Sequence, residues 1–164
     1  MATPAHEQMI ERVREGHLRR LHDRDWSCGP PPFGYQKVGG KLVEVPGEAK
    51  VVRRIFELFL ELKSRAGVAR RLNEEGVRTR RGAKWHRNAV TYILKNPVYA
   101  GANVYGRFEN GDTRLKDRDE WEVVQGMREP MVAVAIFGKA GELLKWRNFW
   151  ITLYPTANSP WNGR

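Results

Sequence analysis

The segment from Val77 to Tyr99 carries positive charge without any counter-charge. It contains no Asp or Glu, and its cationic side chains are Arg78, Arg80, Arg81, Lys84, Arg87 and Lys95. The cations lead through a glycine-containing loop into a short segment with helical apolar spacing. A run of cations at the start of a helix suits a phosphate backbone better than a solvated surface. The segment therefore predicts nucleic-acid binding.

The excess charge of the chain is concentrated around this segment. The 164 residues hold 29 Lys/Arg and 19 Asp/Glu, a net charge of +10, and the stretch from Lys63 to Lys95 alone holds ten Lys/Arg and two acids. A charge of this size indicates an anionic partner, either a nucleic acid or a membrane surface. A basic globular protein without such a partner is the plain alternative. The uneven distribution favours a localised anion-binding face.

Two groups of side chains are the main candidates for nucleic-acid contact. We expect the loop around Arg78 to Lys84 to contact phosphates or a groove. Arg87, Asn88 and Thr91 open the next helix, and Arg and Asn are the residue types suited to guanine and adenine edges. Asn88 is equally suited to a plain helix-start role. The full predicted set is Arg70, Arg71, Arg78, Thr79, Arg80, Arg81, Lys84, Trp85, Arg87, Asn88, Thr91 and Lys95.

Trp85 stands between Lys84 and His86 at the start of that helix. Its ring could stack on a base or sugar. Alternatively it could pack beneath the helix, with the indole N–H bonded to backbone. We favour the packing role, because duplex-binding proteins use stacking less than phosphate contacts.

Residues for covalent or metal chemistry form no motif in this chain. The three serines (Ser27, Ser64 and Ser159) and the four histidines are not spaced as in a catalytic triad motif, and there is no P-loop, GxGxxG or HExxH. Cys28 is the only cysteine, so it makes neither an internal disulfide nor a multi-cysteine zinc site. We therefore predict no catalytic residue, no metal and no cofactor.

The apolar segments of the chain are too short for a membrane span, which needs about 20 residues. The N-terminal residues also have no apolar core typical of a secretory signal. We therefore expect a soluble, cytoplasmic protein that is associated with the nucleoid and not with a membrane.

Apolar spacing and breaker residues predict an α+β fold with a mixed helical core. The segment GPPPFGY (29–35) contains three prolines and predicts a rigid, extended entry. Helix, long loop and helix over 65–95 are arranged like a helix-turn-helix variant. The expected helices are 6–22, 48–62, 65–75, 87–95 and 133–144; the expected strands form a hairpin in 36–46 and a pair at 99–108 and 121–127.

Several pieces of the chain resemble the recombinase domain of the large serine recombinases, the phage integrases and transposon resolvases. They are ERVREG before GPPPFGY, EAKVVRRIFELFLEL, VARRLNEEGVRTRRGAKW, VTYILKNPVYAG and WEVVQGMREPMV with a later IFGKAGELL. The resemblance covers about Ile10 to Leu144. It implies a mixed α/β domain that binds attachment-site or resolution-site DNA beside the crossover point. In that family a long helix, to which MIERVREGHLRRL is similar, leads to a catalytic domain carrying the serine nucleophile.

The sequence departs from this family in several places. The catalytic domain has no counterpart here, so no serine of this chain inherits the nucleophilic role; a zinc ribbon and coiled coil are also missing, and Arg128 replaces a frequent His. We expect a remnant of the linker helix in 1–28, a DNA-binding domain in 29–144, and an unassigned Trp-rich tail in 145–164. The tail fits either a docking hairpin or an out-of-frame end.

The resulting functional prediction is sequence-specific binding of duplex DNA in site-specific recombination, without strand cleavage by this chain. Three alternatives stay open. The chain could be a subunit of a split recombinase whose catalytic domain or subunit is a separate partner. It could be a non-catalytic regulator or remnant. Finally, it could bind RNA, for which the aromatic content is weak support.

Overall fold

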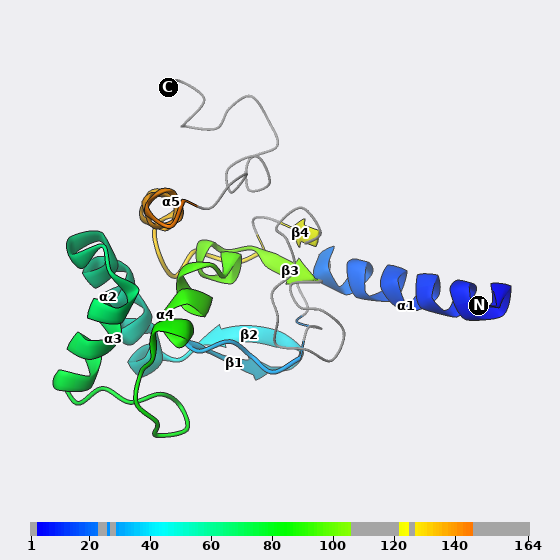
Figure 1. Cartoon of the computed structure of the whole chain (residues 1–164). Coiled ribbons are helices and arrows are strands. Elements are labelled where there is room, and N and C mark those ends of the chain that lie inside the picture. The colour runs from blue at the N-terminus through cyan, green and yellow to red at the C-terminus, as the bar shows by residue number, and fades with distance from the viewer. Residues whose placement is uncertain (1–2, 23–25, 27–28, 106–121, 125–126, 146–164) are drawn as a thin grey trace.

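The computed structural model describes residues 3–22, 26, 29–105, 122–124 and 127–145. Its fold is α+β: a group of helices accompanied by short antiparallel strand pairs (Figure 1). In chain order the elements are α1 (Pro4–His22), β1 (Tyr35–Val38), β2 (Lys41–Glu44), α2 (Pro46–Leu62), α3 (Arg65–Glu74), α4 (Arg87–Leu94), the 3₁₀ helix η1 (Pro97–Ala100), β3 (Asn103–Tyr105), β4 (Glu122–Val124) and α5 (Val134–Leu143).

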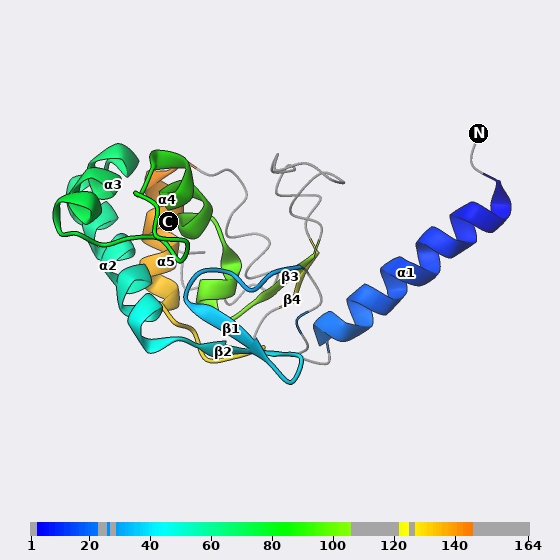
Figure 2. The ribbon, with the colours of Figure 1, turned by 90° about the horizontal axis from the view of Figure 1, so that it is seen from below.

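Helix α2 is the centre of the hydrophobic core. It starts with Pro46, which is tolerated in a first turn, and its C-cap residue Lys63 is left-handed, with its N–H bonded to the carbonyl of Phe59. Its apolar face packs against α3, α4 and α5, which gather on one side of the molecule (Figure 2). Phe56 is fully buried there and meets the rings of Tyr99 and Phe137 at centroid distances of 6.4 and 5.7 Å.

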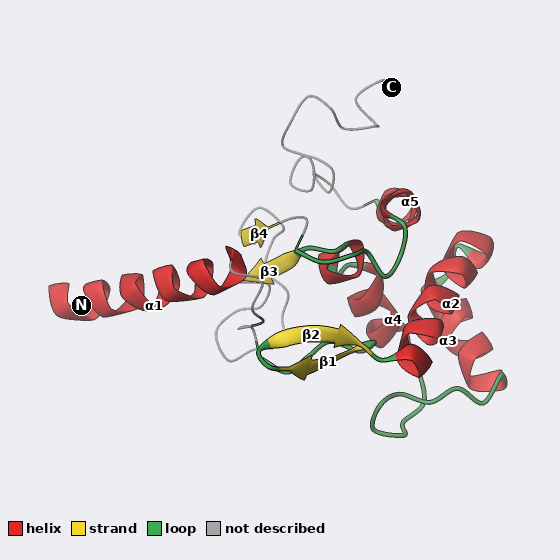
Figure 3. Ribbon diagram, turned by 180° about the vertical axis from the view of Figure 1, so that it is seen from behind, coloured by secondary structure: helices red, strands yellow, loops and turns green. Residues whose placement is uncertain are grey.

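Helices α3 and α4 form the expected helix-turn-helix variant. Ser64 caps α3 by accepting a hydrogen bond from the N–H of Gly67 at 3.1 Å. Gly76 ends this helical region with φ of +76°, a conformation that glycine adopts without a Cβ penalty. Residues 75–86 then form a long loop that extends beyond both helices (Figure 3). The buried apolar faces of α3 and α4 orient this loop and the first turn of α4 toward solvent.

The strand pairs are short and antiparallel. In the first, Tyr35 pairs with Glu44 and Val38 with Lys41, so that Gly39 and Gly40 make the turn. Both glycines have positive φ, as a two-residue turn of this hand requires. In the second pair, Asn103 faces Val124. Among the described side chains of these strands, Tyr35 of β1 is buried in the core.

The structure confirms the expected helices and the first hairpin within one or two residues. It also confirms a strand pair after α4, but the strand expected over 99–108 was wrong at its start. Asn96 caps the N–H of Val98 through its side chain, and Pro97 begins a 3₁₀ turn that ends at Gly101 with φ of +91°. Pairing therefore begins only at Asn103. Residues 106–108 of that expected strand lie outside the described part of the chain.

Helix α1 projects away from the helical group, with its C-terminal end beside β3 and β4 (Figure 1). Its thin apolar stripe is exposed: Met9, Ile10 and Val13 are each more than half accessible to solvent. Among the described residues no helix is both long and apolar enough to cross a bilayer. Apart from Lys145, the tail for which two interpretations were open lies outside the described residues. The division into linker, domain and tail stays a prediction.

Candidate nucleic-acid interface

One face of the molecule, made by α3, the loop 75–86 and the first turn of α4, exposes most of the predicted cations. We call it the basic face and define it by seven exposed residues, leaving out the exposed Arg80 because it is paired with Glu48. They are Arg70, Arg71, Arg78, Arg81, Lys84, Arg87 and Asn88. Among the described residues only Arg71 has a carboxylate partner here, Glu74 at 3.9 Å. An exposed contact of that length adds little stability. The basic face therefore presents largely uncompensated positive charge.

The basic face surrounds an open hollow of about 510 Å³. Four cationic side chains line this hollow against one acid, Glu74. The lining residues are Ala66, Ala69, Arg70, Asn73, Glu74, Arg78, Lys84, Trp85, His86 and Arg87. The hollow ends at the start of α4, where His86 is the N-cap residue and no side chain caps the first turn. The first backbone N–H groups of α4 thus add partial positive charge beside the hollow.

Trp85 belongs to the core and not to the exposed surface. Its side chain is 3% exposed and packs edge-on against Phe33, with ring centroids 5.2 Å apart. A ring buried this deeply cannot stack on a base without leaving the core, which removes Trp85 from the predicted contact set. The favoured packing role fits this burial. The expected backbone partner for the indole N–H was wrong, because among the described residues Nε1 has no hydrogen-bond partner.

Asn73 orients the backbone of Trp85. The side-chain amide of Asn73 accepts a hydrogen bond from the Trp85 N–H at 2.8 Å and donates one to the Trp85 carbonyl at 2.9 Å. This pair joins the last turn of α3 to the residue that precedes the cap of α4. Sequence reasoning missed Asn73 because an Asn near a helix end has many common roles.

The tip of the loop is a tight turn closed by Thr79. The N–H of Gly82 bonds to the carbonyl of Thr79 at 2.8 Å, and the hydroxyl of Thr79 accepts from the N–H of Ala83 at 3.0 Å. Thr79 is therefore a residue that shapes the turn. Arg80 and Arg81 occupy the two central positions of this turn. The side chains of these two neighbouring arginines point in different directions and have different contacts.

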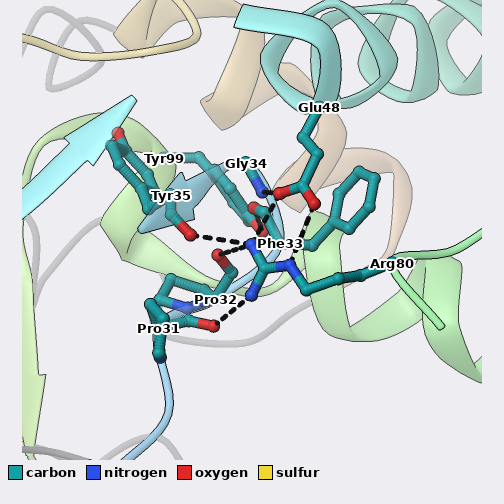
Figure 4. Close-up of polar contacts among 8 residues, drawn as sticks. All are labelled: Pro31, Pro32, Phe33, Gly34, Tyr35, Glu48, Arg80 and Tyr99. Atoms are coloured by element: carbon teal, nitrogen blue, oxygen red, sulfur yellow. Dashed lines mark hydrogen bonds and ion pairs between the residues drawn. The ribbon is translucent and has the colours of Figure 1, made fainter. Parts of the chain in front are cut away.

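Arg80 and Arg81 are both exposed, but among the described residues only Arg80 is bonded back to distant parts of the fold. All three guanidinium nitrogens of Arg80 donate hydrogen bonds within the protein, to Glu48 and to backbone carbonyls of the Pro31–Tyr35 segment (Figure 4). The ion pair raises the pKa of Arg80 and lowers the pKa of Glu48, chiefly through their side-chain hydrogen bond. Sequence reasoning grouped Arg80 with the phosphate contacts and missed Glu48, which is a common acidic residue in the first turn of a helix.

Thr91 and Lys95 lie at the edge of the basic face. The hydroxyl of Thr91 donates to the carbonyl of Arg87 at 2.9 Å and accepts from Arg65 at 3.3 Å. Lys95 is half-buried, and burial, followed by the nearby Arg65, lowers the pKa of its ammonium group. Both are thus less available to a ligand than Arg87 and Asn88. In the described part of the chain, no group of three or more His, Cys, Asp or Glu side chains could hold a metal ion.

Comparison with known proteins places this chain in a family. The family model described as Recombinase matches residues 46–147, more than half of the chain, so the chain belongs to the Recombinase family. A curated protein of Bacillus subtilis (strain 168), named "Putative DNA recombinase", is 36% identical over 99 residues. That match covers 56% of this chain and 20% of the relative. The recombinase resemblance found in the sequence is thereby confirmed.

Two solved structures share the fold, each with a TM-score of 0.62 and 24% identity over 82% of this chain. One is described as "Crystal Structure of a LSR-DNA Complex" and the other as "Sequence Requirements of the Listeria innocua prophage attP site". This chain covers 38% of the first and 51% of the second. It therefore spans only part of the length of each of these three relatives.

Proposed function

We propose that this chain binds duplex DNA through the basic face, as the DNA-binding part of a site-specific serine recombinase. The observation that carries the proposal is the charge balance of the hollow. Four cationic side chains and the uncapped start of α4 lie around it, together with a single acidic side chain, Glu74. Membership of the Recombinase family supports it, as do the descriptions of the two structural neighbours, of which one names DNA and the other an attP site.

The basic face divides into side chains of two roles. Arg70 on α3 and Arg78, Arg81 and Lys84 on the loop are exposed and would neutralise phosphates, which supplies affinity without sequence information. Arg87 and Asn88 occupy the first turn of α4, where side chains of a recognition helix reach base edges in the major groove. Phosphates crossing the hollow would fix the register in which α4 meets the bases.

The salt dependence of DNA binding tests this proposal. We expect Arg81→Ala and Lys84→Ala each to weaken binding to all duplexes and to flatten the slope of log K against log salt by about 0.9. Lys139→Ala, on the exposed side of α5 and outside the basic face, is the matched control, because it removes the same charge elsewhere. Equal slopes for all three variants and the parent would place DNA on another surface.

Competition between duplex DNA and RNA separates the RNA-binding alternative. The buried ring of Trp85 offers no stacking surface, which favours duplex DNA over single-stranded RNA. In this proposal, the serine nucleophile for strand cleavage comes from another part of the protein or from a separate subunit. The proposed role also implies an intracellular location near the nucleoid. Preference for one fragment of the flanking DNA over a scrambled duplex would demonstrate site recognition.

A further inference from the structure

We infer that Arg80 is a positioning residue that holds the basic face in its binding geometry, and that it makes no DNA contact of its own. The inference rests on the proposed DNA binding and deepens it. Arg80 ties the turn at 79–83 to two distant segments, the first turn of α2 and the proline-rich entry at 31–35. Arg81 and Lys84, on either side of Gly82 and Ala83, then take their places from this anchor.

The contacts of Arg80 use all three nitrogens of its guanidinium group (Figure 4). Nε donates to one carboxylate oxygen of Glu48 at 2.9 Å, and one terminal nitrogen donates to the other at 2.5 Å. That same nitrogen donates to the carbonyls of Tyr35 at 2.7 Å and Pro32 at 3.3 Å, while the second terminal nitrogen donates to that of Pro31 at 3.1 Å. Bidentate pairing of this kind fixes both distance and orientation.

The acceptors of Arg80 are themselves held in place. The N–H of Gly34 donates to Glu48 at 2.8 Å, and the Tyr99 hydroxyl donates to the carbonyl of Phe33 at 2.6 Å. Prolines at 31 and 32 restrict the backbone that presents the carbonyls. A Cβ at Gly34 would lie 3.1 Å from the Met131 side chain and 3.2 Å from that of Val52, so this backbone sits tightly on the core. Arg80 is thus anchored to a rigid segment.

Charge compensation separates Arg80 from its neighbours. Glu48 neutralises Arg80, and the carboxylate is largely shielded, with its side chain 20% exposed against 41% for Arg80. Among the described residues Arg81 and Lys84 have no carboxylate within ion-pair distance. A phosphate approaching this turn would gain more from Arg81 and Lys84 than from a cation whose charge is already paired.

The two interpretations of Arg80 predict opposite effects of a change at Glu48. Glu48→Gln removes a negative charge near the basic face, so simple electrostatics predicts tighter binding to DNA. If Arg80 acts as an anchor, Glu48→Gln loosens the turn and weakens binding instead. We expect Arg80→Ala, Arg80→Lys and Glu48→Gln each to raise Kd by about tenfold. A loss of this size corresponds to part of the free energy of a hydrogen bond to a charged group. Lysine fails because its ammonium cannot reproduce the planar fork.

The test measures duplex-DNA affinity of these variants across a range of salt concentrations, with thermal unfolding of each measured in parallel. The inference requires weaker binding by Arg80→Ala with the parental salt slope, while Arg81→Ala lowers the slope by about 0.9. A slope lowered by the same amount in Arg80→Ala would show a direct phosphate contact. Parental affinity in a folded Arg80→Ala, or tighter binding by Glu48→Gln, would also overturn the inference. If the parent itself binds no duplex, the proposed function fails first.

Discussion

Asn73 and Trp85 are joined by a pair of hydrogen bonds in which one side-chain amide satisfies both the N–H and the carbonyl of one backbone residue. The pair connects the end of α3 to the start of α4 across the loop that carries Arg78, Arg81 and Lys84 of the basic face. Because the Trp85 ring is buried on Phe33, Asn73 links the loop to the core as well as to a helix.

Replacing Asn73 by Ala removes both of these hydrogen bonds and leaves the Trp85 backbone groups unpaired in a part-buried position. We expect the free energy of unfolding to fall by about 1–3 kcal/mol. Urea denaturation followed by circular dichroism measures this loss. Asn88→Ala is the matched control, since Asn88 is exposed on α4 and its removal should change stability by less than about 0.5 kcal/mol. An equal, small effect in both variants would contradict the assigned role of Asn73.

Arg87 and Asn88 should determine which duplex is preferred. We expect Arg87→Ala and Asn88→Ala to reduce discrimination between the preferred duplex and a scrambled one by about 1–3 kcal/mol. Lys84→Ala should weaken both duplexes alike, because a phosphate contact carries no sequence information. Competition binding with the two duplexes measures the ratio. Unchanged discrimination in both α4 variants would move base recognition to another element.

Acid should release the anchor formed by Glu48 and Arg80. The hydrogen bond from Arg80 holds the pKa of Glu48 below its ordinary value of 4.5. The unfolded state therefore takes up this proton first, and the contribution of Glu48 to stability is present above about pH 4.5 and is lost as the pH falls through the lower folded-state pKa. Denaturation midpoints measured across this range should fall less steeply with acid in Glu48→Gln. Parallel curves for parent and variant would argue against the anchor.

Tyr35 should respond to alkali. Its buried hydroxyl has no hydrogen-bond partner among the described residues, and burial raises its pKa to about 12, although Arg128 lies over the ring at 5.9 Å. The folded state thus keeps this proton while the unfolded chain loses it near the ordinary value of 10.0, so stability falls as the pH rises between these values.

Tyr35→Phe tests that assignment by removing the hydroxyl and keeping the ring. We expect parental or slightly higher stability at neutral pH. Removing an unpaired buried hydroxyl should raise the free energy of unfolding by up to about 1 kcal/mol. The variant should also lose less stability on alkaline titration than the parent. Urea midpoints at neutral and alkaline pH give both numbers; a clear loss of stability at neutral pH would mean that the hydroxyl has a bonding partner.

The sequence was sufficient for the parts of the fold that depend on periodicity. The apolar face of α2, with Val52, Ile55 and Phe56, repeats at helical spacing and is buried as expected. Gly39-Gly40 is a two-residue turn signal and makes the turn of the first hairpin, and Asn96-Pro97 is a helix-stop signal and directly follows the C-cap residue of α4. These signals are local, because each depends on residues within one or two turns of the chain.

The roles within the candidate site depend on longer contacts and could not be predicted in this way. Arg80 and Arg81 are identical, exposed neighbours in the turn closed by Thr79, but only Arg80 is bonded to distant segments of the chain. The partner of Arg80, Glu48, stands 32 residues earlier in the chain. Tertiary pairing of this kind leaves no periodic trace in a single sequence, so charge alone grouped the two arginines together.

The exposed first turn of α4 has a consequence for redesign. Arg87 and Asn88 are exposed, whereas Val90, Ile93 and Leu94 are buried and hold the helix in the core. The positions that face the proposed ligand can therefore be randomised without touching the positions that fold the domain. A library at 87 and 88 should retain the parental melting temperature in most members. If the proposed DNA binding holds, the same scaffold offers a way to retune target preference independently of its architecture.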